Sequence, residues 1–318
     1  MYIEYLPIEN LNSSILNEPV NIEILDNIKA DMLQDLNSYE ALDISLKYNV
    51  NPVTEWYMEV FDKIFSKVET VADLINLARF TFNSKLGNKV IIFNLSCYFN
   101  CYGLLNNNCS CSKICYAGKL AIRQLNKTVS NYIFYEYVKR SGRLDILEYG
   151  TITAINKAVA EVKGSFTDIK SIRFNEVGEI ATAEDLFYIE LIYYYLRQYK
   201  GSLKAYTYST SLHLKDLFKT SDITIRLSKG FNYKALDSSY YNSFSVIVEP
   251  ETVLEAKVEA EAQGLKFILC CGTCKCCQSC NLKNTVVGFV NHSGTTKKQL
   301  ELKIKQCQDL LKLQEVTV

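Results

Sequence analysis

The spacing of hydrophobic and polar residues changes along the chain and separates an N-terminal stretch from the rest. Over residues 52–83, apolar side chains recur every three or four positions, which predicts two amphipathic helices. The first fifty residues are polar and rich in asparagine, with weak helical spacing over residues 21–48. We expect residues 1–85 to form an N-terminal helical extension and residues 86–318 to form the main, metal-binding domain.

From residue 89 onward, short apolar runs alternate with helical patterns. The runs are rich in β-branched and aromatic residues, which predicts buried strands, and their alternation with helices indicates βαβ units around a parallel sheet. We therefore expect a partial or complete parallel (β/α) barrel of six to seven strands. The predicted strands cover residues 89–95, 169–174, 203–208, 223–227, 244–248, 266–270 and, less clearly marked, 286–290.

Three helices are predicted between or after these strands, over residues 182–199, 251–262 and 295–313. The first opens with Thr182 and Asp185 at the spacing of a capping box. The second begins just after Pro250 and stops at Gly264, as helix-start and helix-stop preferences favour. The third closes the chain.

Composition and charge narrow the classes of function. The 318 residues are 48% hydrophobic and 22% charged, which is typical of a globular protein. Lys plus Arg and Asp plus Glu both number 35, so no bulk positive field supports binding to nucleic acid. The chain opens without the pattern of a secretory signal and has no apolar run of about 18 residues. We expect a cytoplasmic protein without a membrane partner, acting on an unknown small-molecule or macromolecular substrate.

The twelve cysteines fall into two groups and one isolated residue, Cys307, whereas the chain has only two histidines. Clustered thiols in a reducing compartment hold metal more often than they form disulfides. Because histidines are scarce, all-cysteine iron–sulfur or zinc sites are expected.

The second group contains four cysteines at a strict spacing of three, Cys271, Cys274, Cys277 and Cys280. This spacing is close to the bacterial ferredoxin run, in which successive thiolates wrap one cluster. Cys-x2-Cys pairs bind zinc equally well, so the spacing does not decide between zinc and an iron–sulfur cluster.

The first group follows the first predicted strand of the main domain. Its spacing is looser, but loops at the carboxyl ends of strands are where α/β proteins build their sites. Metal binding and reduced thiols packed in an irregular loop are the two interpretations. The two groups could form separate sites or one shared site. The cysteines concerned are Cys97, Cys101, Cys109, Cys111 and Cys115.

Other polar residues lie at or near the ends of predicted strands, where they would face a bound cofactor or substrate. Structural pairing of each side chain is the alternative interpretation. Glu176 and Glu179, together with His292, are candidates for acid–base chemistry. The candidates for cofactor binding are Arg173, Asn175, Tyr208, Ser209 and Arg226.

The strand that leads into Cys97 and Cys101 resembles the opening of a radical S-adenosylmethionine enzyme. In that superfamily a first strand leads into a three-cysteine loop that carries a 4Fe-4S cluster. The segment from Arg173 to Glu179 resembles the place of its Gly-Gly-Glu element, which binds the methionine amino group. The chain departs from the pattern at Leu104, where the third cysteine would fall, and Gly178 is the only glycine of the pair.

A closer resemblance is to the phage gene product 88 family, over about residues 89–292. The shared elements are Cys-x3-Cys-Tyr-Ala, an Arg-x4-Gly-Glu strand end, Tyr-Thr-x-Ser, a Cys-x2-Cys-x2-Cys run and an apolar-Phe-x-x-His segment. They occur here in the same order, at 111–117, 173–179, 206–209, 274–280 and 287–292. The resemblance implies a barrel-like metalloprotein, in the host cytoplasm if the chain is phage-encoded.

Three functions follow, in order of preference. The first is an iron–sulfur protein on a radical-S-adenosylmethionine-like barrel, with one or two 4Fe-4S clusters, the second being auxiliary, and S-adenosylmethionine as a further cofactor. The second is a zinc-binding structural or interaction module without catalysis, with nucleic acid or another protein as its partner. The third is a metalloenzyme that uses Glu176, Glu179 or His292 and no S-adenosylmethionine.

Overall fold

The computed structural model places eight strands in one sheet, in the order β1-β2-β3-β4-β5-β6-β8-β7. Strands β2 to β8 are parallel, and the short β1 pairs with β2 in the antiparallel sense. The structure describes residues 5–9, 11–40, 53–82, 87–95, 125–175, 179–229, 232–239, 241, 243–270, 279–291 and 295–316. The strands are β1 (Thr81–Phe82), β2 (Val90–Phe93), β3 (Ser171–Phe174), β4 (Lys204–Ser209), β5 (Thr224–Ser228), β6 (Ser243–Val248), β7 (Lys266–Leu269) and β8 (Thr285–Val290).

The prediction of a parallel α/β sheet is confirmed, and each predicted strand corresponds to one of β2 to β8. Two features of the sheet were not predicted from the sequence. The two-residue β1 is too short to give a periodic signal. In addition, β8 lies between β6 and β7, so that β7 forms an edge of the sheet.

The two faces of the sheet have different surroundings. Ile91 and Phe93 of β2 belong to the main hydrophobic core, which the helices share. The alternate residues Val90 and Ile92 pack instead with Tyr206 in a small cluster on the opposite face. Successive side chains of a strand point to opposite faces, so the helices pack against one face of β2, and Cys280 packs against the cluster on the other.

That second face is concave. The rings of Tyr208 on β4 and Phe289 on β8 are 5.6 Å apart, although β5 and β6 separate these strands in the sheet. In a flat sheet the two strands would lie about 14 Å apart, at roughly 4.8 Å per strand. The contact therefore requires the sheet to curve around this face, called the concave face below.

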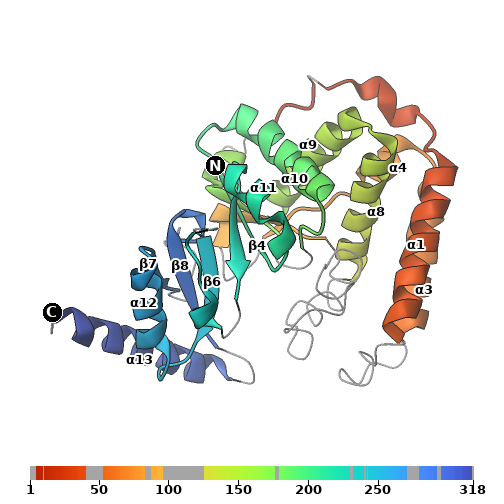
Figure 1. Ribbon diagram of the computed structural model, residues 1–318. Coiled ribbons are helices and arrows are strands. Elements are labelled where there is room, and N and C mark those ends of the chain that lie inside the picture. The colour runs from red at the N-terminus through yellow and green to blue at the C-terminus, as the bar shows by residue number, and fades with distance from the viewer. Residues whose placement is uncertain are drawn as a thin grey trace.

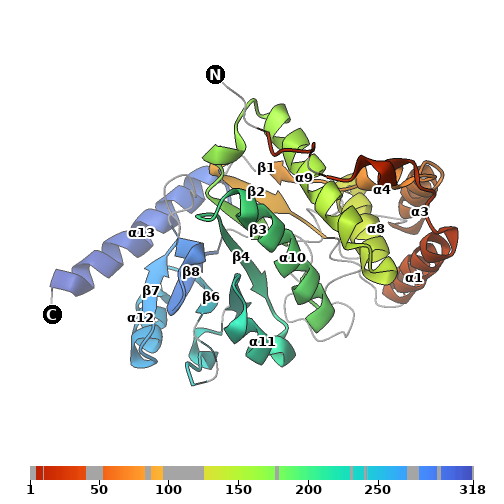
Figure 2. The same ribbon diagram turned by 90° about the horizontal axis from the view of Figure 1, so that it is seen from above.

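Helices lengthen the molecule at both ends of the sheet (Figures 1 and 2). Helices α1 and α3 pack on α8 at one end, and α13 lies beside α12 and β8 at the other (Figures 1 and 2). In the described part of the chain, no helix has the length and hydropathy needed to cross a membrane. The helices are α1 (Ile22–Glu40), α3 (Val53–Phe65), α4 (Val71–Ile75), α8 (Leu125–Ser141), α9 (Leu144–Glu161), α10 (Ala183–Tyr199), α11 (Lys215–Thr220), α12 (Val253–Ala262) and α13 (Lys297–Val316).

Candidate functional site

The carboxyl ends of β3 and β4 hold a buried carboxylate, Glu179. Its side chain is 4% exposed, and Ser209 at the end of β4 donates a hydrogen bond from Oγ to Glu179 Oε1 at 2.8 Å. The next residue, Thr210, donates from Oγ1 at 2.9 Å and from its backbone N–H to the same oxygen. Two of the predicted residues, Glu179 and Ser209, thus meet at this edge, and Thr210, which sequence reasoning missed, joins them.

The backbone after Glu179 is fixed by the capping box of α10. Asp185 accepts hydrogen bonds from the N–H groups of Ala181 at 3.1 Å and Thr182 at 3.0 Å, as the sequence predicted for Thr182. The other oxygen of Asp185 accepts from Lys139 of α8 at 2.8 Å. Burial opposes the charge of Lys139, but the carboxylates of Glu136 and Asp185 outweigh it and raise the lysine pKa. This network positions the segment that carries Glu179.

The side chain of Asn175, just beyond β3, has no hydrogen-bond partner among the residues that the structure describes. The residue is 4% exposed and adopts a left-handed backbone, φ 54°, which asparagine tolerates better than most residues. Its N–H donates to Phe93 O at 2.8 Å, whereas Oδ1 and Nδ2 of the buried carboxamide make no hydrogen bond in the described structure. An unsatisfied buried polar group costs about 1–3 kcal/mol, so this amide is suited to a bound ligand.

On the concave face, Arg173, Tyr208 and Cys280 form a chain of contacts. The Arg173 guanidinium carbon lies 5.4 Å from the centre of the Tyr208 ring. The Tyr208 hydroxyl donates a hydrogen bond to Cys280 Sγ at 2.8 Å. Desolvation of that hydroxyl and the negative charge of a Cys280 thiolate raise the Tyr208 pKa well above its ordinary value, so Tyr208 keeps its proton and remains a donor.

Arg226 on β5 anchors the segment that carries Cys280. Its side chain is fully buried and donates to the carbonyls of Ser279 at 2.9 Å and Cys280 at 3.2 Å, and to Thr285 O at 3.0 Å. Burial lowers the Arg226 pKa, and no carboxylate in the described part of the chain pairs with it. The short helix Ser279–Asn281 therefore packs on the concave face of the sheet.

Most of the predicted metal ligands lie outside the described residues. The two cysteine-rich segments nevertheless start from the carboxyl ends of β2 and β7, which lie at the same edge of a parallel sheet. Among the residues that the structure describes, no group of three or more His, Cys, Asp or Glu side chains could hold a metal ion. The predicted residues outside the description are Cys97, Cys101, Cys109, Cys111, Cys115, Cys271, Cys274, Cys277, Glu176 and His292.

Comparisons with protein-family models, curated proteins and solved structures found no match to the chain. The function of the site is therefore inferred from its contacts and from the sequence. Two groups of contacts are available, the Tyr208–Cys280 pair on the concave face and the Glu179–Asn175 region at the carboxyl edge of β3 and β4.

Proposed function

We propose that the protein binds an iron–sulfur cluster through thiolates of its cysteine-rich segments, on a barrel-like sheet related to that of radical S-adenosylmethionine enzymes. Of the proposed cysteine ligands, Cys280 is the one whose contacts the structure describes. The observation that carries the proposal is the hydrogen bond from the Tyr208 hydroxyl to Cys280 Sγ at 2.8 Å.

The surroundings of Cys280 favour a thiolate. A hydroxyl donor stabilises a negative sulfur, and the buried Arg226 guanidinium binds the main chain of the same segment without a carboxylate partner in the described structure. Thiolates that ligate iron–sulfur clusters accept such hydrogen bonds, which adjust the reduction potential. These residues therefore fit a cluster, which when bound supplies one-electron transfer. Cysteine ligation also suits the reducing cytoplasm.

The carboxyl edge of β3 and β4 fits the polar end of S-adenosylmethionine. The resemblance implies that Glu179 binds the methionine amino group, and Ser209 and Thr210 hold that carboxylate in place. Asn175 adds a buried donor and a buried acceptor that lack partners within the described residues. A ligand with an ammonium and a carboxylate would supply a donor for Asn175 Oδ1 and an acceptor for Asn175 Nδ2.

A zinc-binding structural or interaction module is the second candidate. The observation that favours it is the cysteine-only spacing of Cys271, Cys274, Cys277 and Cys280, which suits tetrahedral zinc as well as a cluster. In that case Tyr208 would stabilise a zinc thiolate and the sheet would serve as a scaffold.

Anaerobic purification followed by iron, sulfide and zinc analysis separates the candidates. We expect iron and sulfide in equal amounts, visible absorbance, and an EPR signal of the reduced protein that changes when S-adenosylmethionine is added. Zinc without sulfide or colour would overturn the iron–sulfur proposal in favour of the zinc module. A cluster whose EPR signal does not change on adding S-adenosylmethionine would support the iron–sulfur proposal but exclude S-adenosylmethionine as a cofactor.

A further inference from the structure

Lysines stand at the start of three neighbouring strands, along the amino edge of the sheet. Lys89 and Lys170 directly precede β2 and β3, and Lys204 is the first residue of β4. The N–H of Lys170 donates to Lys89 O at 2.8 Å, and the N–H of Lys204 donates to Lys170 O at 3.2 Å. Because neighbouring strands are about 4.8 Å apart, the three backbones lie side by side within roughly 10 Å.

A fourth lysine, Lys200 at the end of α10, lies beside the start of β3. Its Nζ donates hydrogen bonds to Ile169 O at 2.6 Å and to Thr167 O, and its side chain is partly buried. Burial lowers the Lys200 pKa, the carboxylate of Asp168 raises it, and the positive charge of Lys170 lowers it further. The charges of Lys170 and Lys200 are therefore close enough to act on each other.

These four residues, called the lysine patch below, are Lys89, Lys170, Lys200 and Lys204. The patch is a local excess of positive charge in a chain whose net charge is zero. The starts of the three strands, over residues 87–89, 165–170 and 200–204, contain the four lysines and one acid, Asp168. Like charges on neighbouring strands repel each other, so the arrangement costs stability until an anion lies among them.

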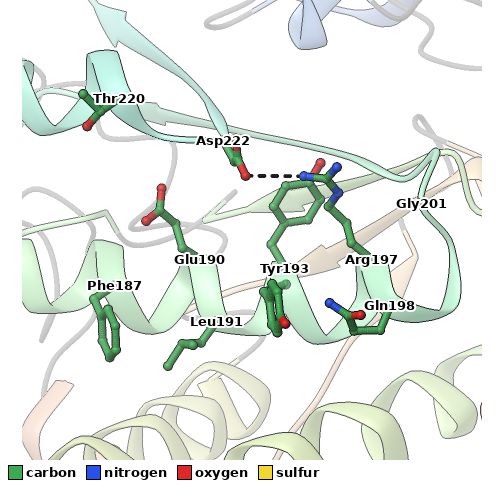
Figure 3. Close-up of a pocket in the computed structure, with 10 residues that line it drawn as sticks. Phe187, Glu190, Leu191, Tyr193, Arg197, Gln198, Gly201, Thr220 and Asp222 are labelled. Atoms are coloured by element: carbon green, nitrogen blue, oxygen red, sulfur yellow. Dashed lines mark hydrogen bonds and ion pairs between the residues drawn. The ribbon is translucent and has the colours of Figure 1, made fainter.

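Most of the positive charge of the patch is not neutralised by the chain itself. Lys89, Lys170 and Lys204 are exposed and form no ion pair within the described part of the chain. At the next strand the charges are balanced, because Asp222, two residues before β5, pairs with Arg197 of α10 at 3.4 Å (Figure 3). The excess charge is therefore confined to the starts of β2, β3 and β4, where a negatively charged partner can reach it.

We propose that the lysine patch binds the phosphate backbone of a nucleic acid. Lysines bind phosphates as point charges, and duplex DNA offers one negative charge per about 1.7 Å of its axis. A protein partner would need apolar contacts at the centre of the interface. None of the large apolar side chains exposed in the described chain lies in residues 87–89, 165–170 or 200–204. Contacts to phosphates carry no sequence information, so the binding is independent of sequence, and it does not depend on which metal the cysteines hold.

Fluorescence anisotropy of a labelled DNA duplex, titrated with the full chain at several salt concentrations, tests the proposal. With a duplex of about 20 base pairs we expect a Kd of about 1–100 μM at about 50 mM salt. The logarithm of the association constant should fall with the logarithm of the salt concentration with a slope of about −3 to −4, because each neutralised phosphate contributes about −0.9. The triple variant Lys89→Gln/Lys170→Gln/Lys204→Gln should bind at least about tenfold more weakly and reduce the size of the slope by about 2 to 3.

The triple variant Lys298→Gln/Lys305→Gln/Lys312→Gln is the matched control, because it removes the same charge from three exposed lysines of α13. It should change the slope by less than about 1, since no phosphate contact is lost. A chain that does not bind the duplex would overturn the proposal, as would equal losses in the two triple variants. Binding to vesicles of anionic lipid without binding to DNA would assign the patch to a membrane surface and would likewise overturn it.

Discussion

The hydroxyl of Tyr208 donates a hydrogen bond to the sulfur of Cys280 at 2.8 Å, although the two residues are 72 positions apart in the chain. The bond joins the end of β4 to the segment that leads into β8, across the concave face of the sheet. It connects the cysteine-rich sequence to the polar residues of the strands, and it gives the proposed cluster a contact that can be altered without removing a ligand.

Replacing Tyr208 with phenylalanine should lower the reduction potential of the cluster. The hydroxyl favours the more negative, reduced state, and a bond worth about 1 kcal/mol more in that state corresponds to about 40 mV for one electron. An EPR-monitored redox titration measures the shift. Tyr193→Phe is the control. It also removes a buried tyrosine hydroxyl, but one on α10 that donates a hydrogen bond to Leu203 O at 2.8 Å. Equal potentials in the Tyr208→Phe and wild-type proteins would contradict the prediction.

Replacing Arg226 with methionine should destabilise the fold by about 3–5 kcal/mol, because the buried carbonyls that it satisfies would lose their donor. Urea denaturation of the protein measures the change. Arg143→Met, which removes an arginine with partly exposed ion pairs to Glu18 and Asp145, should cost about 1 kcal/mol or less. Similar losses for the two variants would show that Arg226 does not anchor the Cys280 segment.

Asn175→Gly should stabilise the protein in the absence of ligand by about 1 kcal/mol, because it removes two buried polar atoms that lack partners within the described residues, and because glycine is suited to positive φ. The same change should abolish the rise in melting temperature on adding S-adenosylmethionine. Thermal unfolding with and without that compound measures both effects. A less stable variant would mean that the Asn175 carboxamide serves the fold and not a ligand.

Asp35 on α1 should make stability depend on pH. Burial, with the carboxylates of Asp31 and Glu136, raises its pKa from 3.8 to about 6. The folded state therefore holds this proton more tightly than the unfolded state, so the ionised carboxylate costs stability above pH 6 and the cost disappears as the pH falls from about 6 through 3.8.

The variant Asp35→Asn isolates this effect. Because Asp35 is half-buried and partly screened, we expect a gain of about 1 kcal/mol at pH 7.5, and little or no gain near pH 4. Urea denaturation at the two pH values measures the difference. Asp62→Asn, which alters an exposed carboxylate paired with Lys29 at 2.8 Å, should not show this pH-dependent gain. A gain for Asp35→Asn that is equal at both pH values would contradict the pKa shift.

Local patterns predicted the elements of the fold well. The apolar run at Val90–Phe93 and the Thr182–Asp185 capping box both act over a few neighbouring residues, and both were found where expected. The exchange of β7 and β8 depends on contacts between distant segments, which no local pattern encodes. Arg226 was chosen for its position late in a strand, yet its partners are carbonyls of residues 244–285 that only the folded chain brings near.

The most direct test compares cluster content in the wild-type protein, Cys280→Ser and Cys307→Ser, all prepared anaerobically. Cys307 is the matched control because it is fully buried outside both cysteine groups, and burial raises its pKa to about 11, which keeps it a neutral thiol. We predict that Cys280→Ser loses iron and sulfide or alters the EPR signal of the cluster, while Cys307→Ser retains both. Wild-type protein without iron and sulfide, or a Cys280→Ser variant with an unchanged cluster, would contradict the account.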